Sequence, residues 1–239
     1  MTSLLENDNE YYILDMDDDL ENNQVDQENN DIIIRYKKLF LWIASLFSFI
    51  AYTRLLCLTD IFNNCKEYTP LNTYNSFSEI FTRGTILFFI SRINNTEIYK
   101  KKYYYITVAS MIIIWELLDK IFPDLYIRSN HIPTKYMVLL VSMSIVIFFL
   151  YIYHLWLAYK LHKMYVYIYI LTVIGMFIYY IVFYFNLEKY YDIYIHHYFI
   201  FGTLALLPQF DNILSKMCLC LCIGIWIHGI GVYGAGYVI

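Results

Sequence analysis

Histidine and carboxylate residues recur at the ends of apolar segments in this chain. His196 and His197 open one such segment, His228 closes the next, and Glu116 and Asp119 lie near the end of an earlier one. Imidazole and carboxylate groups can exchange protons near neutral pH, and both are common metal ligands. These positions therefore predict a polar site that handles protons, a polar solute or a metal ion.

A metal centre is one interpretation of these residues. His196, His228 and Glu116 would together form the ligand set of a catalytic zinc with an open fourth position, and haem is the related alternative. Asp192 precedes His196 by four residues and would orient its imidazole. His197 points about 100° away from His196 on a helix, so only one of the two can face the site. The competing interpretation is packing and ion pairing at the ends of membrane spans.

Other ionisable residues interrupt apolar segments, where a charge costs about 2.5 to 3.5 kcal/mol on insertion scales and therefore needs a partner or a task. Glu79 and Arg83 lie four residues apart in the favourable order for an ion pair on a helix. By contrast, His154 is expected at the opposite, cytoplasmic interface. The predicted polar cluster at the exoplasmic end comprises Arg54, Glu79, Arg83, Glu116, Asp119, Asp192, His196, His197 and His228.

The composition indicates which elements must position this cluster. Hydrophobic residues make up 59% of the 239 residues, charged residues only 16%, and the mean hydropathy is +0.46. A soluble domain has roughly 45–50% apolar and about 25% charged residues. A net charge of -4 also argues against a nucleic-acid-binding protein. The predicted fold is an all-α polytopic transmembrane bundle, and its main partner is the lipid bilayer.

About 20 apolar residues are needed for a helix to cross a bilayer core. Seven segments reach or approach this length: 39–58, 77–91, 103–122, 136–159, 165–185, 193–210 and 214–232. Because 77–91 contains Glu79 and Arg83, a six-span bundle with a re-entrant helix there is the alternative. Seven spans with a cytoplasmic N-terminus place ten flanking Lys and Arg residues inside and four outside, as the positive-inside rule requires. We therefore predict seven.

The first 34 residues differ from the rest of the chain. They contain 11 of the 21 acidic residues and no Lys or Arg, so residues 35–239, with 17 basic and 10 acidic residues, carry a net charge of +7. Such a polar, charged segment cannot bury enough apolar surface to fold by itself. We predict a disordered acidic cytoplasmic tail over 1–34, which could dock a protein partner, and a transmembrane helical domain over 35–239.

Cysteines and glycines predict two local features of the bundle. Cys57 and Cys65 flank the outer end of the first span and can form a disulfide if that side is oxidising. Glycines along the last span, among them Gly224 and Gly231, allow a neighbouring helix to approach closely.

The last two segments carry a recognisable pattern. It consists of His196-His197-Tyr198 with Gly202, Leu206 and Phe210, then Gly224, His228-Gly229-Ile230 and Tyr233-Gly234-Ala235. This pattern resembles the C-terminal end of a group of uncharacterised multi-span membrane proteins of fungi and protists. The resemblance implies a shared two-helix unit but no activity. The last span lacks the H-x-x-x-H motif of seven-span lipid hydrolases of the adiponectin-receptor and alkaline-ceramidase type.

Three functions fit these observations. The favoured one is a transporter-like protein of the endomembrane system or plasma membrane, in which Glu116, Asp119 and His228 line the path of a small polar solute. The second is a membrane-embedded, metal-dependent enzyme that modifies lipid. The third is a structural or assembly subunit of a membrane complex. Whether the protein is an enzyme is therefore open.

Overall fold

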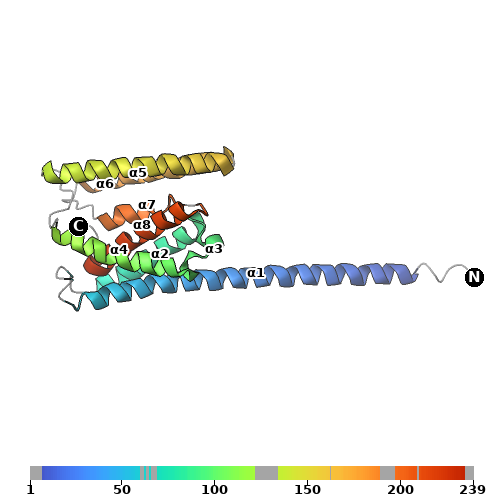
Figure 1. Ribbon diagram of the computed structural model, residues 1–239. Coiled ribbons are helices and arrows are strands. Elements are labelled where there is room, and N and C mark those ends of the chain that lie inside the picture. Colours follow the sequence, from blue (N-terminus) through green and yellow to red (C-terminus); the bar gives the residue numbers. More distant parts are fainter. Residues whose placement is uncertain are drawn as a thin grey trace, which may run out of the picture. The chain divides into compact units, whose positions relative to one another are not determined.

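The computed structural model describes residues 7–59, 62, 65, 69–121, 134–161, 163–188, 197–208 and 210–234. Within these ranges all regular structure is helical, as the sequence predicted, and contains no strand. The elements are α1 (Asn7–Leu56), α2 (Pro70–Ile90), α3 (Ile93–Thr96), η1 (Ile98–Lys100), α4 (Lys102–Ile121), α5 (Thr134–Leu161), α6 (Lys163–Glu188), α7 (His197–Leu204) and α8 (Ile213–Tyr233) (Figure 1).

Every apolar segment that the sequence predicted as a span overlaps one of these helices. Among the described residues, three stretches are long and apolar enough to cross a membrane, namely Asn30–Leu56, Ser144–Leu161 and Ile213–Tyr233. A helical membrane protein is consistent with this finding, whereas the number of seven spans stays a prediction.

Two helices differ from their predicted bounds. α2 begins at Pro70, not at residue 77, because Thr69 caps it by accepting a hydrogen bond from the amide of Asn72. The described part of α7 runs from His197 to Leu204, so this helix ends before the predicted residue 210, and residues 193–196 lie outside the described part. The helix ends in a turn just before Pro208. There the amide of Leu206 donates to the carbonyl of Thr203, and the amide of Leu207 donates to the carbonyl of Leu204.

The acidic N-terminal segment also differs from expectation, because α1 extends back to Asn7, where the sequence predicted disorder. A helix can grow from an existing turn without a new nucleus, a possibility that composition does not reveal. The chain divides into two compact units at Leu41 and Trp42, within α1. The predicted domain boundary at residue 34 stays a prediction.

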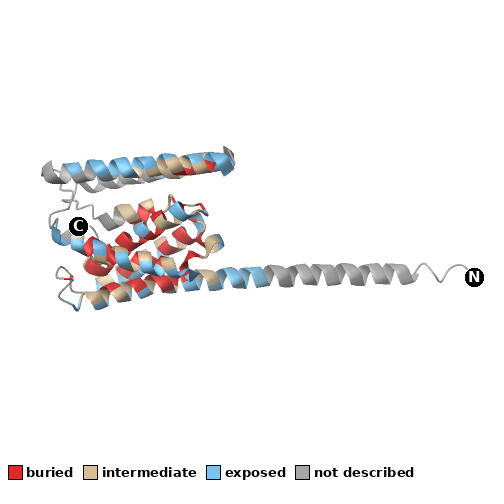
Figure 2. Ribbon diagram, in the orientation of Figure 1, coloured by how far each residue is buried: buried red, intermediate tan, exposed pale blue. Residues whose placement is uncertain are grey.

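The core of the second unit lies around α8, whose residues are buried over most of its length (Figure 2). Glycines bring neighbouring helices close to one another. A Cβ atom at Gly224 would lie 2.6 Å from Met111 Cβ on α4, and one at Gly84 on α2 would lie 2.8 Å from Leu46 Cδ1 on α1. The indole of Trp42 donates a 2.8 Å hydrogen bond to the carbonyl of Gly84. The predicted close packing along the last span is therefore confirmed.

The contacts between helices reveal their relative directions. Thr107 on α4 contacts Met217 early in α8, and Glu116 contacts His228 late in α8, so these two helices run parallel. By contrast, Trp42 contacts Gly84 whereas Phe47, further along α1, contacts the earlier Phe77, so α1 and α2 run antiparallel. These relative directions are the ones expected of a chain that crosses a membrane repeatedly, with each span opposite in direction to the one before it.

Gly224→Ala is expected to lower the free energy of unfolding by about 1 kcal/mol or slightly more, because the added methyl group would overlap Met111 Cβ and the Val108 carbonyl, which lies 3.1 Å away. Gly175→Ala is the matched control, since a Cβ there meets no atom within 4 Å. Thermal unfolding in detergent, followed by circular dichroism, measures both. Equal effects of the two substitutions would contradict the close packing of α4 and α8.

Candidate functional site

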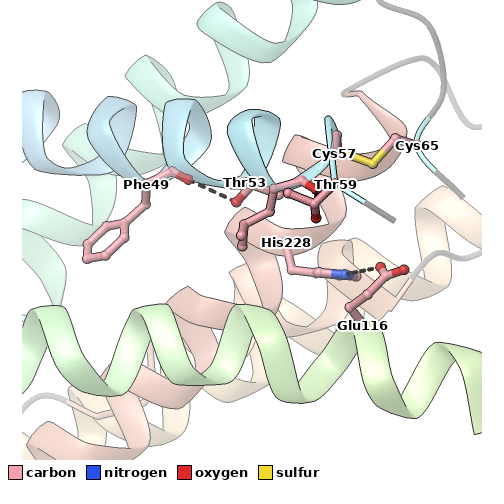
Figure 3. The surroundings of a disulfide bond; sticks show 8 residues. Phe49, Thr53, Cys57, Thr59, Cys65, Glu116 and His228 are labelled. Atoms are coloured by element: carbon pink, nitrogen blue, oxygen red, sulfur yellow. Dashed lines mark hydrogen bonds and ion pairs between the residues drawn. A yellow bond between two sulfur atoms is a disulfide. The ribbon is translucent and has the colours of Figure 1, made fainter. Parts of the chain in front are cut away.

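Glu116 and His228 form a buried pair between α4 and α8. His228 Nε2 lies 3.1 Å from Glu116 Oε2, and both side chains have an exposed fraction of 0% (Figure 3). The two residues are 112 positions apart, and the parallel packing of α4 and α8 brings them together. The sequence placed both residues in one polar cluster, and the structure joins them directly.

A small apolar shell surrounds this pair at the C-terminal ends of α1 and α8. The ring of Phe62, which is 3% exposed, lies 6.0 Å from the His228 ring, and the ring of Tyr233 lies 6.4 Å away on edge. A Cβ atom at Gly231 would lie only 2.5 Å from Thr53 Cγ2, which shows how closely the ends of α1 and α8 meet. Water therefore has little access to the pair.

A disulfide bond closes a short loop next to this apolar shell. Cys57 and Cys65 are bonded, with Cα atoms 5.8 Å apart, as the sequence suggested for an oxidising side (Figure 3). Phe62 lies inside the loop that this bond closes, so the disulfide and the aromatic cover of His228 belong to one segment. The loop links the end of α1 to the buried pair.

The Glu116–His228 contact brings a carboxylate and an imidazole together away from water. Glu116 Oε2 meets the imidazole, whereas Glu116 Oε1 is buried without a hydrogen-bond partner among the described residues. Burial of a carboxylate or an imidazole is costly unless the group is hydrogen-bonded, and each of these two side chains gives the other a partner. The pair thus joins, in a buried position, the two kinds of side chain that most often serve in proton transfer.

The metal interpretation stays a prediction. The part of the chain that the structure describes contains no group of three or more His, Cys, Asp or Glu residues that could hold a metal ion. Glu116 and His228 would supply two ligands, but Asp192 and His196 lie outside the described residues.

Other predicted members of the polar cluster are placed only in part. His197 begins α7 and Asp119 lies in α4, yet the side chains of both lie outside the described part. Arg54 lies in the last turn of α1, the helix end that holds the disulfide.

Glu79 and Arg83 form the ion pair that the sequence predicted, with 2.8 Å between Arg83 Nε and Glu79 Oε1. Their position differs from expectation. Because α2 starts at Pro70, the pair lies in the middle of the helix and not near its outer end. Arg83 also donates to Thr203 Oγ1 on α7 over 3.4 Å. The side chains of Glu79 and Arg83 are 26% and 15% exposed, respectively.

A polar cavity of about 470 Å³ adjoins this ion pair. Its walls come from α2, α6 and α7, and three threonines line it together with the two charged residues. Glycines at two wall positions leave room where side chains would otherwise fill the space. The lining residues are Glu79, Thr82, Arg83, Ile86, Thr172, Gly175, Gly202, Thr203 and Leu206.

The structure buries His154, for which the sequence predicted an interfacial position. Its Nδ1 lies 2.7 Å from the carbonyl of Leu150, and its Nε2 lies 3.1 Å from Ser215 Oγ on α8. The imidazole stacks on Phe210 at 5.8 Å and on Tyr169 at 6.4 Å. The apolar residues around His154 in the sequence resemble those of any span end, so no local pattern distinguishes this buried group.

No protein-family model matches the chain, and neither a curated protein nor a solved structure matches it.

Proposed function

We propose that this chain is a transporter-like integral membrane protein that moves a small polar solute. The observation that carries this proposal is the polar cavity between α2, α6 and α7, which places an ion pair and three hydroxyl groups in the middle of apolar helices. Charged residues at such a depth are characteristic of substrate and ion pathways.

The cavity offers complementary groups to a zwitterionic solute. The guanidinium of Arg83 can bind a carboxylate, and the carboxylate of Glu79 can bind an ammonium group. The hydroxyl of Thr172 donates to the carbonyl of Ile168, which leaves its oxygen free to accept from a ligand. Free amino acids are solutes of this kind.

The Glu116–His228 pair has a different role in this proposal from the one that the sequence suggested. Both side chains are completely buried, so neither lines a solute path in this conformation. We assign to the pair the exchange of a proton that accompanies transport, in a conformation that admits water. Asp119, whose side chain lies outside the described part, stays a predicted member of the site.

The helix directions and the disulfide support the proposed orientation. α4 and α8 run parallel, as expected for the third and seventh spans, and Thr53 near the end of α1 lies next to Gly231 near the end of α8, as expected for the first and seventh spans. Disulfides persist on the oxidising side of a membrane, so the Cys57–Cys65 end is proposed as exoplasmic and the N-terminus as cytoplasmic. The endomembrane system and the plasma membrane both fit. Docking of a protein partner by residues 1–34 and the C-terminal family resemblance stay proposals.

Proteoliposomes that contain the full chain test the transport proposal. We expect uptake of amino acids from an equimolar mixture, measured by mass spectrometry, and a decrease of more than tenfold in Arg83→Gln, because the zwitterion loses its carboxylate partner. Thr85→Val is the control, since Thr85 lies two residues away, donates to the carbonyl of Phe81 and does not line the cavity.

Equal uptake by Arg83→Gln and Thr85→Val, or no uptake above that of empty liposomes, would contradict transport through this cavity. Metal analysis of the same preparation addresses the enzyme alternative. Stoichiometric zinc or iron that is lost in His228→Ala would favour a metal-dependent enzyme in place of a transporter.

A further inference from the structure

A second cavity lies between α4, α5, α6, α7 and α8, and it differs in chemistry from the polar one. Its volume is about 330 Å³, and apolar side chains such as Trp115, Leu150, Leu204 and Leu221 form most of its walls. Cavities of this size are typical of ligand sites. No side chain of the polar cavity contributes to it, so its interpretation does not depend on the transport proposal.

Tyr169 on α6 lines this crevice beside His154. The side chain is only 1% exposed, and its hydroxyl has no hydrogen-bond partner among the residues that the structure describes. The ring is held between neighbours, stacked on Tyr151 at 5.6 Å and on His154 at 6.4 Å. Both His154 ring nitrogens already have partners, whereas the Tyr169 phenol is a polar group that a ligand can satisfy. Buried hydroxyls in a bilayer need such a partner.

The length of the crevice matches one hydrocarbon leaflet. On α5 its lining residues run from Ser142 to His154, which lie twelve positions apart. At a rise of 1.5 Å per residue this distance is about 18 Å, close to half of the roughly 30 Å hydrocarbon core. One extended acyl chain therefore fits along the crevice.

The lining residues exclude a charged head group. None of the described residues that line it is Asp, Glu, Lys or Arg, and His154 and Pro208 are among these lining residues. A fatty-acid carboxylate would find no cation there and would carry an uncompensated charge into an apolar site. An ester or hydroxyl oxygen would instead satisfy the phenol without a charge.

We propose that this crevice binds a single-chain acyl lipid with an uncharged polar end, of the monoacylglycerol class. The acyl chain lies along α5 and α8 towards Trp115, and the Tyr169 hydroxyl bonds to a hydroxyl or ester oxygen of the lipid.

Photolabelling of the full chain in phosphatidylcholine nanodiscs tests this site. The probe is a monoacylglycerol that carries a diazirine in its acyl chain, and labelled residues are mapped by mass spectrometry. We expect saturable labelling of residues on α5 and α8 that line the crevice, removed by excess unlabelled monoacylglycerol. A fatty acid and a sterol that each carry a diazirine are the two comparison probes. Both are expected to label these residues at least fivefold less than the monoacylglycerol probe.

Two pairs of variants locate the lipid. Tyr169→Phe is expected to reduce the affinity for the probe about five- to tenfold through loss of one hydrogen bond, whereas Tyr167→Phe, an exposed neighbour outside the crevice, leaves it unchanged. Val146→Trp fills the crevice and is expected to abolish saturable labelling, whereas the adjacent Ile145→Trp does not. Val146 and Ile145 are 57% and 50% exposed, so both variants should fold.

Several outcomes would overturn the proposal. Labelling that does not saturate would identify ordinary boundary lipid. Equal competition by the fatty acid or the sterol would assign the crevice to another ligand class. Unchanged labelling in both Tyr169→Phe and Val146→Trp would place the lipid elsewhere.

Discussion

Glu116→Ala is expected to lower the free energy of unfolding by about 3 kcal/mol or more. The substitution removes the partner that lies 3.1 Å from His228 Nε2 and leaves a cavity between α4 and α8, where both side chains are completely buried. The imidazole would then face apolar neighbours such as Phe62. Chemical unfolding in mixed micelles, followed by circular dichroism, measures this loss.

A double-mutant cycle separates the pair from simple loss of volume. Glu116→Gln keeps the size of the side chain and an amide that can hydrogen-bond to the imidazole, so it should cost less than Glu116→Ala. We expect a coupling free energy of about 1 kcal/mol or more between Glu116→Ala and His228→Leu, as found for residues in direct contact. Strict additivity of the two substitutions would show that the contact contributes nothing to stability.

Removal of the disulfide should have the second largest effect on stability. The double variant Cys57→Ser, Cys65→Ser is expected to lose about 2 to 3 kcal/mol, because the bond closes a loop of sequence separation 8 and restricts the unfolded chain. The same loop holds Phe62 against the His228 ring, so looser packing there would add to the loss. Thermal unfolding with and without a reductant measures the effect.

The reductant also provides the internal control. It should lower the unfolding temperature of the wild type to that of the double variant and leave the variant unchanged, because Cys218, Cys220 and Cys222 are free thiols. Alkylation without reduction should modify neither Cys57 nor Cys65. A wild type that is insensitive to reductant, with both thiols alkylated, would refute the disulfide and remove its support for an exoplasmic position.

Local sequence features were sufficient to predict the positions of the helices and one interaction. Long apolar segments indicated α2, α4 to α8 and the second half of α1, since about 20 such residues are what a bilayer requires, but they indicated neither the short α3 and η1 nor the extension of α1 back to Asn7. The i, i+4 spacing of Glu79 and Arg83 predicted their ion pair, because both lie on one face of a single helix. The ends of the helices were harder to predict from the sequence. Because Thr69 caps α2, this helix begins seven residues before the predicted start, and the ion pair therefore lies in its middle.

The composition and order of residues by themselves determined that the chain is helical and apolar, and that its ionisable groups are few. Which of those groups meet was decided only by the tertiary structure. Glu116 and His228 are 112 positions apart, and their contact requires the parallel register and mutual rotation of α4 and α8, which Gly224 permits at close approach. The burial of His154 against Ser215 depends in the same way on contacts between helices. No periodicity within one helix encodes such long-range geometry, because it arises from the packing of side chains across several helices at once.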